Sequence, residues 1–535
     1  MRLGARRLMG AWVVVVAVVW AGGVAHAAPW GTWDGAMALI DRAAEAGHVE
    51  RRVIGRSVEG RPIVAVRVAA TFPEEADREP VTVVLLVGLQ HGDEPAGGRA
   101  MLDLIAEVGA DRSVLPGALE LHVVPILNPD GAVVDGRRNA AGFDLNRDHH
   151  LVSQPETAAL HAYVREVRPH VVVDGHEFNR TTGDYAERGW TEWPLVTLGV
   201  CQSPLHGPGL SEAGRAVLDA VAPAMDAAGV NFAEYLVGDA PGVAGGELRP
   251  STLDTDDCRN GLAMHGAVGF IVESGIKRSA DDPHADLAER VAGYRVLLDA
   301  MLGDESRLAA MRDAAEAARA AELGDVLPVD FLWARRDARA TGVRVIDAAT
   351  GATVEVAATN VMDTAVVKRL VAVPRGYAVR GKAAVSEFAA LLDRHGIGYA
   401  VVGVSGVGVE SEAKPRAAWG AEVVELVAME AGYDARYHRY GGRQITAVRE
   451  AGAVQLGAGA LVVDLDALVV DLDALGVVEA RRAAALLEPQ MTYGLYQWPA
   501  FASLVGDDGV MPVIRLLEVI DEPAAVSAAS PGATP

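Results

Sequence analysis

Two histidines and a glutamate stand where apolar runs of the sequence end. His91 and Glu94 form an H-x-x-E spacing just after the apolar run 81–89, and His176 closes the run 170–175. Two imidazoles and one carboxylate can hold a hydrolytic zinc ion and leave one coordination position for water. Each of these residues alone is more often structural, but together they predict a site for one Zn²⁺.

A second carboxylate and a pair of arginines add groups that amide hydrolysis requires. Glu273 emerges from the apolar run 269–272, so it could take a proton from water and pass it to the leaving amine. Arg137 or Arg138 could stabilise the negative charge that develops on the carbonyl oxygen. The structural alternatives are a salt-bridged glutamate at a strand end and solvated loop charges.

Apolar runs and helical patterns alternate around these residues. Runs with little polar alternation predict strands that are buried on both faces. They cover residues 81–87, 121–127, 170–173 and 268–272. The segments 95–107 and 154–167 show helical spacing of their apolar residues. We therefore expect an α/β domain with a mixed, largely parallel central sheet flanked by helices. Ligands in such domains gather at the carboxyl ends of the strands, where the candidate residues stand.

An ordered set of motifs resembles the zinc carboxypeptidase family, in a bacterial-type branch with a C-terminal extension. The motifs are H-G-D-E at 91–94, N-P-D-G at 128–131, R-R-N-A-A-G-F-D-L-N-R-D at 137–148, Q-P-E-T at 154–157, D-G-H at 174–176 and F-I-V-E-S at 270–274. The resemblance covers roughly residues 30–305. It implies that His91, Glu94 and His176 bind zinc and that Glu273 is the general base.

The same resemblance implies roles for four further residues. Arg137 would stabilise the oxyanion, while Asn146 and Arg147 would bind the terminal carboxylate of the substrate. Asp144 resembles an aspartate that hydrogen-bonds a zinc-binding histidine and orients it.

One stretch departs from the family pattern. Archetypal members carry a tyrosine before the strand that contains the glutamate, whereas residues 251–260 contain none. Arg259 and Asn260 resemble an Arg-Asn pair of some bacterial branches, so Arg259 is a candidate for substrate binding. The segment 178–190 is interpreted as an additional substrate loop.

Length and composition predict two exported domains. A chain of 535 residues is too long for one ordinary hydrophobic core, so two folded domains are expected. Residues 1–27 have a basic start, an apolar run and the small-x-small site 25–27, which is typical of a signal peptide and predicts a secreted or periplasmic protein. We expect a catalytic domain at 28–305, a helical linker at 306–326, a smaller α/β or α+β domain at 327–521 and a disordered tail at 522–535. The net charge of −24 argues against nucleic acid as a partner, and no segment after the signal is apolar enough to cross a membrane.

The second domain shows local patterns without an evident role. Residues 343–356 predict a hairpin, and 370–373, 383–395 and 398–402 predict a strand–helix–strand unit. The tandem repeat 462–475 lacks the glycine and the terminal glutamate of a calcium loop, so a duplicated strand or loop is favoured. Cys201 and Cys258 could form a disulfide or stay free.

Three functions compete. The first is an exported zinc metallocarboxypeptidase that acts on peptides with a free C-terminal carboxylate. The second is a zinc amidohydrolase of the same fold that acts on N-acyl amino acids or cell-wall peptides. The third is an inactive zinc-bound binding module, against which the presence of Glu273 and Arg137 argues.

Overall fold

The computed structural model describes residues 31–519 apart from a set of excluded segments. These are 71–79, 182, 277–283, 336–339, 375, 381, 403–417, 435–438, 458–466, 472–475, 489–490, 492–500, 502 and 505–509. The predicted signal peptide and the tail 522–535 lie outside the described residues. Within the described ranges, no helix combines the length and apolar character needed to span a bilayer.

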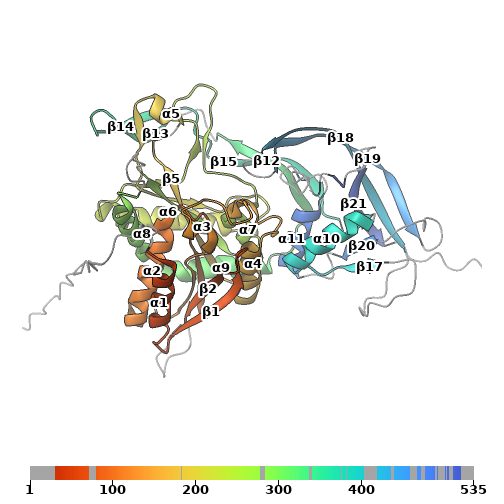
Figure 1. The fold of residues 1–535 in the computed structure, drawn as a ribbon. Helices are drawn as coiled ribbons and strands as arrows, with labels where there is room; N and C mark the ends of the chain where they lie inside the picture. Colours follow the sequence, from red (N-terminus) through yellow and green to blue (C-terminus); the bar gives the residue numbers. More distant parts are fainter. Residues whose placement is uncertain are drawn as a thin grey trace, which may run out of the picture.

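The first domain is built on an eight-stranded sheet (Figure 1). In chain order its strands are β1 (Val49–Arg56), β2 (Pro62–Val68), β3 (Thr82–Val87), β4 (Leu119–Val124), β5 (Val171–Asn179), β7 (Val196–Val200), β8 (Phe232–Glu234) and β11 (Val268–Ile276). Their spatial order is β1-β2-β4-β3-β5-β11-β7-β8. The centre, β4-β3-β5-β11, is parallel, and β2 and β7 pair with it antiparallel. The edge strand β1 pairs antiparallel with β2, and the edge strand β8 pairs parallel with β7. The expected mixed, largely parallel sheet is confirmed.

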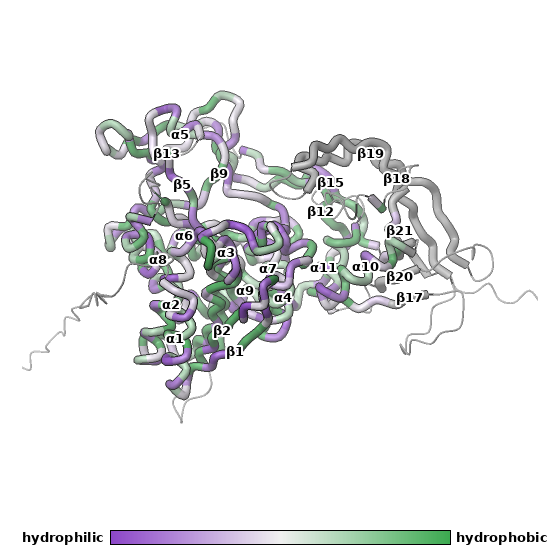
Figure 2. The backbone as a smooth tube through the Cα atoms, viewed as in Figure 1, coloured by the Kyte–Doolittle hydropathy of each residue, from purple (hydrophilic) through white to green (hydrophobic). Residues whose placement is uncertain are grey.

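Helices cover both faces of this sheet. One face carries α1 (Trp33–Ala43), α2 (Pro95–Ala110), α6 (Leu210–Ala227), α8 (Leu287–Leu302) and α9 (Glu305–Ala320), and the other carries α4 (Pro155–Val167) and α7 (Cys258–Ala263). Strand β3 shows why both faces need cover, because Val84 and Leu86 enter one core while Leu85 and Val87 enter the other. Figure 2 shows the hydrophobic colouring concentrated in the interior of this domain, for example along β2.

Two strands extend beyond their predicted ends. The apolar runs predicted strands that end before His176 and Glu273, but β5 and β11 continue past these residues as neighbouring parallel strands. Glu273 pairs in register with His176 on one side and with Thr197 of β7 on the other. Backbone pairing on both sides thus fixes the position of Glu273 along its strand relative to His176.

The second domain follows α9. It contains the pair β12 (Val326–Ala334) and β15 (Thr364–Ala372), the hairpin β13 (Thr341–Asp347) and β14 (Thr353–Ala358), and helices α10 (Lys382–His395) and α11 (Val477–Leu487). A six-stranded sheet has the order β17 (Ala400–Val402), β20 (Ala467–Asp471), β16 (Gly376–Arg380), β21 (Val510–Val519), β18 (Ala418–Asp434) and β19 (Arg439–Gly457). The predicted hairpin and helix are confirmed, and the strands predicted at 370–373 and 398–402 overlap β15 and β17. Strand β16, which lies between β15 and α10, was not predicted. Of the tandem repeat, only β20 is described.

The two domains share contacts at two places. The core of the second domain includes Leu151, Leu205, Leu253 and Met264 of the first. In addition, β13 pairs with β6 (Trp190–Glu192) of the first domain. In Figure 1, β13 and β14 lie with α5 (Gly183–Glu187) above the end of β5. A bridge between Leu248 of β10 (Leu248–Arg249), which pairs with β9 (Val237–Gly238), and Val361 holds the same region.

Candidate metal centre

The loop between β3 and α2 is shaped to present His91. Gly92 packs so closely on the next loop that a Cβ atom would lie 2.1 Å from the backbone carbon of Gly131. The N-P-D-G motif forms that loop and the short helix α3 (Pro129–Val133). Its Asn128 accepts a hydrogen bond from Gly131 N (2.9 Å) and donates one to Gln90 O (3.1 Å). The motif therefore braces the histidine loop.

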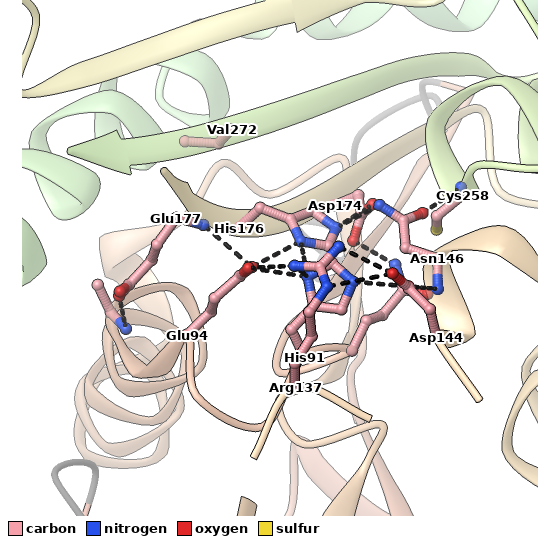
Figure 3. A network of polar contacts seen from close by, with 12 residues as sticks. His91, Glu94, Arg137, Asp144, Asn146, Asp174, His176, Glu177, Cys258 and Val272 are labelled. Carbon is pink, nitrogen blue, oxygen red and sulfur yellow. Dashed lines mark hydrogen bonds and ion pairs between the residues drawn. The ribbon is translucent and has the colours of Figure 1, made fainter. Parts of the chain in front are cut away.

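His91, Glu94 and His176 converge on one point, as the sequence predicted (Figure 3). Nδ1 of His91 lies 2.9 Å from Oε1 of Glu94, and Nδ1 of His176 lies 2.8 Å from Oε2 of the same carboxylate. The two Nδ1 atoms are 3.1 Å apart. All three side chains are buried, and they form a group that could hold a metal ion.

Each histidine is oriented through its other ring nitrogen by an aspartate. Nε2 of His91 lies 2.8 Å from Asp144, and Nε2 of His176 lies 2.8 Å from Asp174. Burial alone would raise the pKa of Asp144, but His91 and Arg137 hold it well below its ordinary value. Sequence reasoning identified Asp144 and missed Asp174, although Asp174 stands two residues before His176 and so shares its side of β5.

A further layer supports Asp174. Gln90 donates from Nε2 to Asp174 (2.6 Å), and its Oε1 lies 2.9 Å from Nε2 of His149. His149 in turn contacts His161 of α4 at 3.1 Å. The chain of polar contacts therefore runs from the candidate metal ligand to the helix that borders the second domain.

Arg137 is the arginine that faces this group. Its Nη1 lies 3.0 Å from Oε1 of Glu94, while Nε and Nη2 donate to Oδ2 of Asp144 at 3.1 and 2.9 Å. Arg138, the alternative, donates to Gly142 O instead. Asp144 thus holds both a histidine and the arginine, which couples their positions.

Glu273 is buried beside the group and carries one oxygen, Oε2, without a hydrogen-bond partner among the described residues. Burial raises its pKa to about 7, while His176 opposes this rise. The hydroxyl of Tyr235 donates a hydrogen bond to Glu273. Burial, together with Glu273, keeps the pKa of Tyr235 well above its ordinary value, so the phenol stays protonated. Sequence reasoning missed Tyr235 because it lies after β8, far from the expected stretch 251–260.

The remaining candidate residues surround this centre. Asn146, in the short helix η2 (Leu145–Arg147), is buried; its Nδ2 lies 2.9 Å from Nε2 of His176 and its Oδ1 accepts from Cys258 N at 2.7 Å. Arg147 donates to the backbone oxygen of Asn146. Arg259 is buried and paired with Asp257 at 3.1 Å, while its Nε and Nη1 have no hydrogen-bond partner in the described chain. Contacts of these three residues with a substrate stay predictions.

Both cysteines are buried and free. The amide of Gly269 donates to the sulfur of Cys201, and Cys258 begins α7. No disulfide therefore contributes to this region.

A cavity of about 430 Å³ is lined by residues of both domains, including two neighbours of Glu273. Its wall includes Thr197, the register partner of Glu273, and Tyr235. Phe178 and Tyr185 come from the predicted substrate loop, and residues 341–344 come from the second-domain hairpin. The expected loop thus lines a cavity, which the hairpin completes.

Part of this sequence is similar to known carboxypeptidases. The zinc carboxypeptidase family matches residues 37–181. Carboxypeptidase 2 of Trichophyton rubrum is 33% identical over 128 residues, which are 23% of this chain and 24% of the relative. Carboxypeptidase SOL1 of Arabidopsis thaliana is 34% identical over 131 residues, which are 22% of this chain and 26% of that protein. The chain thus spans about a quarter of the length of these relatives.

Solved structures of carboxypeptidases also match parts of this chain, at lower identity and with TM-scores below 0.5. A metallo-carboxypeptidase from Pseudomonas aeruginosa, in complex with (2-guanidinoethylmercapto)succinic acid, is 22% identical and has a TM-score of 0.39, covering 52% of this chain and 70% of that one. Carboxypeptidase A from Helicoverpa armigera is 17% identical with a TM-score of 0.37, covering 56% and 77%. The family match includes His91, Glu94 and His176. Residues 37–181 of this chain are therefore similar to the zinc carboxypeptidase family, and the curated relatives that match are named carboxypeptidases.

Proposed function

We propose that this protein is a zinc metallocarboxypeptidase that removes C-terminal residues from peptides. The observation that carries the proposal is the convergence of His91, Glu94 and His176 beside a buried Glu273. Two imidazoles and a carboxylate are the donor set of a catalytic zinc site, and aspartates that hydrogen-bond the imidazoles are typical of such sites. One Zn²⁺ bound there would supply a water with a lowered pKa and would polarise the substrate carbonyl.

Glu273 moves the proton in this proposal. Its unpartnered Oε2 is free to accept a proton from the attacking water, and the same carboxyl group then protonates the leaving amine. Burial raises the pKa of this carboxyl group above its ordinary value, which favours its protonated form as the donor to the amine. Tyr235 orients the carboxylate through its hydroxyl.

Two arginines bind the charged parts of the substrate. Arg137 is held by Asp144 next to Glu94, where its guanidinium can donate to the oxygen of the scissile carbonyl as negative charge develops. Arg147 offers a planar set of donors that matches a terminal carboxylate. Asn146 keeps its predicted role near that carboxylate and also braces His176.

The cavity beside Glu273 favours a peptide substrate over a small N-acyl amino acid. A volume of about 430 Å³ is large enough for a side chain that precedes the scissile bond. A small acyl group would leave most of it empty. The intact Glu273 and Arg137 also argue against an inactive binding module.

The test compares one peptide as free acid and as C-terminal amide, with wild type and Arg147→Ala. An amide would leave a desolvated guanidinium without its partner, so we expect wild type to prefer the acid by about 10²-fold or more. Arg147→Ala should lose most of that preference through a raised KM. Equal rates on acid and amide, or cleavage well inside the peptide, would indicate an endopeptidase.

We also propose that the enzyme acts outside the cytoplasm. The support is the basic, then apolar segment 1–27 with its cleavage site. N-terminal sequencing of the exported protein should give Ala28 as the first residue. An uncleaved Met1 in a membrane fraction would contradict this.

A further inference from the structure

The cavity beside Glu273 has aromatic walls. Phe178 extends β5 past the candidate metal ligand, Trp193 follows β6, and Phe232 and Tyr235 come from β8 and the residue after it. Aromatic faces attract cations electrostatically. Arg344 of the second-domain hairpin already demonstrates this, because its guanidinium carbon lies 4.8 Å from the centre of the Trp193 ring.

The cavity wall carries more acidic than basic side chains. Glu192, Glu234 and Asp226 line it together with Arg344. Glu234 has a partner, since Arg215 lies 3.4 Å from its carboxylate. The structure gives the side chain of Glu192 no hydrogen bond and no ion pair among the described residues. Arg180, whose charge lowers the pKa of Glu192, directs Nε and Nη2 to the backbone oxygens of residues 192 and 193.

The second domain holds Glu192 in place. Glu192 pairs with Val345 in the β6–β13 register, so the hairpin fixes this strand over the cavity. Asn360 anchors the other side of the hairpin by donating to Ala240 O (3.0 Å) and accepting from Gly242 N (2.8 Å). Burial raises the pKa of Glu192 to about 7, so a cationic ligand would stabilise a carboxylate that is poorly stabilised without it.

We propose that this two-domain cavity is a substrate subsite for a basic side chain that precedes the scissile bond, with Glu192 as its counter-ion and the aromatic walls as its lining. The inference rests on the proposed peptidase function and gives the second domain a role in specificity. The cation would be a primary ammonium or guanidinium group on an otherwise extended peptide.

The test uses five-residue peptides with one fixed C-terminal leucine. The second or third residue from the C-terminus is lysine, or norleucine as an uncharged analogue of similar size. We expect wild type to cleave the lysine peptide with a kcat/KM about tenfold higher at one of these positions, as a charge-assisted hydrogen bond would give. In Glu192→Gln, the lysine-to-norleucine ratio of kcat/KM should fall close to one. Thermal unfolding checks that this variant is folded.

Two further variants sharpen the test. Arg344→Gln removes a cation from the same wall, so the lysine-to-norleucine ratio should rise. Glu187→Gln changes an exposed glutamate of α5 outside the cavity and should leave the ratio unchanged. Equal cleavage of lysine and norleucine peptides by wild type, or an unchanged ratio in Glu192→Gln, would overturn the inference while leaving the peptidase proposal intact. Failure to cleave any peptide would instead refute the peptidase function.

Discussion

The two aspartates behind the candidate zinc ligands offer a matched comparison. Asp144→Asn and Asp174→Asn each remove the negative charge that faces Nε2 of a histidine at 2.8 Å. Losing such a support lowers metal affinity by roughly 10–100-fold. Both variants should therefore bind zinc more weakly by a similar factor.

The two aspartate variants should differ in kcat. Asp144 also accepts two hydrogen bonds from Arg137, whereas the second oxygen of Asp174 accepts from Gln90. An amide at position 144 that keeps its oxygen toward His91 turns its NH₂ group toward the guanidinium. Removing one oxyanion donor costs about 10²–10³ in kcat. At saturating zinc, Asp144→Asn should lose a large part of that factor, and Asp174→Asn should stay within a few-fold of wild type.

The assay is zinc titration against a chromophoric chelator, followed by kcat at saturating zinc. Arg137→Ala supplies the control, because it should lower kcat strongly in wild type and only slightly in the Asp144→Asn background. Equal kcat for the two aspartate variants, or zinc affinity unchanged in both, would refute the reasoning.

Three other predictions concern neighbouring features. Tyr235→Phe removes the hydroxyl that donates to Glu273, and we expect kcat to fall about tenfold, the equivalent of one hydrogen bond, with zinc content unchanged; an unaltered kcat would contradict this. Gly92→Ala forces a Cβ atom into the backbone of Gly131, so it should weaken zinc binding and lower the melting temperature, while Gly60→Ala at an open turn should leave zinc binding intact. Burial lowers the pKa of His161, His265 and His395 well below the ordinary value, and the positive charge of Arg482 lowers it further. The unfolded chain takes up protons near pH 6.5 that the folded chain does not, so stability is complete above that pH and falls by about 1–2 kcal/mol per histidine by pH 5. Urea unfolding at pH 7.5 and 5.5 measures this, and His265→Gln should reduce the difference.

The sequence allowed prediction of the features that local patterns carry. Apolar runs located the central strands, and the motifs indicated His91, Glu94 and His176, which lie together in the structure, with Arg137 and Asp144 in contact with them. The extents of β5 and β11 were wrong, because an apolar run marks where a strand is buried and not where its backbone pairing ends. His176 and Glu273 are polar residues that continue their strands through hydrogen bonds to neighbours.

Features that depend on distant pairing were not predictable. Tyr235 reaches Glu273 only because β8 lies beside β7 in parallel, a register that no local pattern encodes. The hairpin at 341–358 was recognisable, but its pairing with β6 over the cavity was not. The periodicity of a strand shows which residues share a face and leaves its partner strand undetermined.

The most direct test of the central claim follows one unblocked peptide by mass spectrometry with zinc-loaded wild type and Glu273→Gln. We expect successive loss of single residues from the C-terminus with wild type. Glu273→Gln should keep its zinc and its circular dichroism spectrum but cleave the peptide about 10²–10⁴-fold more slowly. Near-wild-type cleavage by Glu273→Gln, or intact peptide after prolonged incubation with the zinc-loaded wild type, would contradict the central claim.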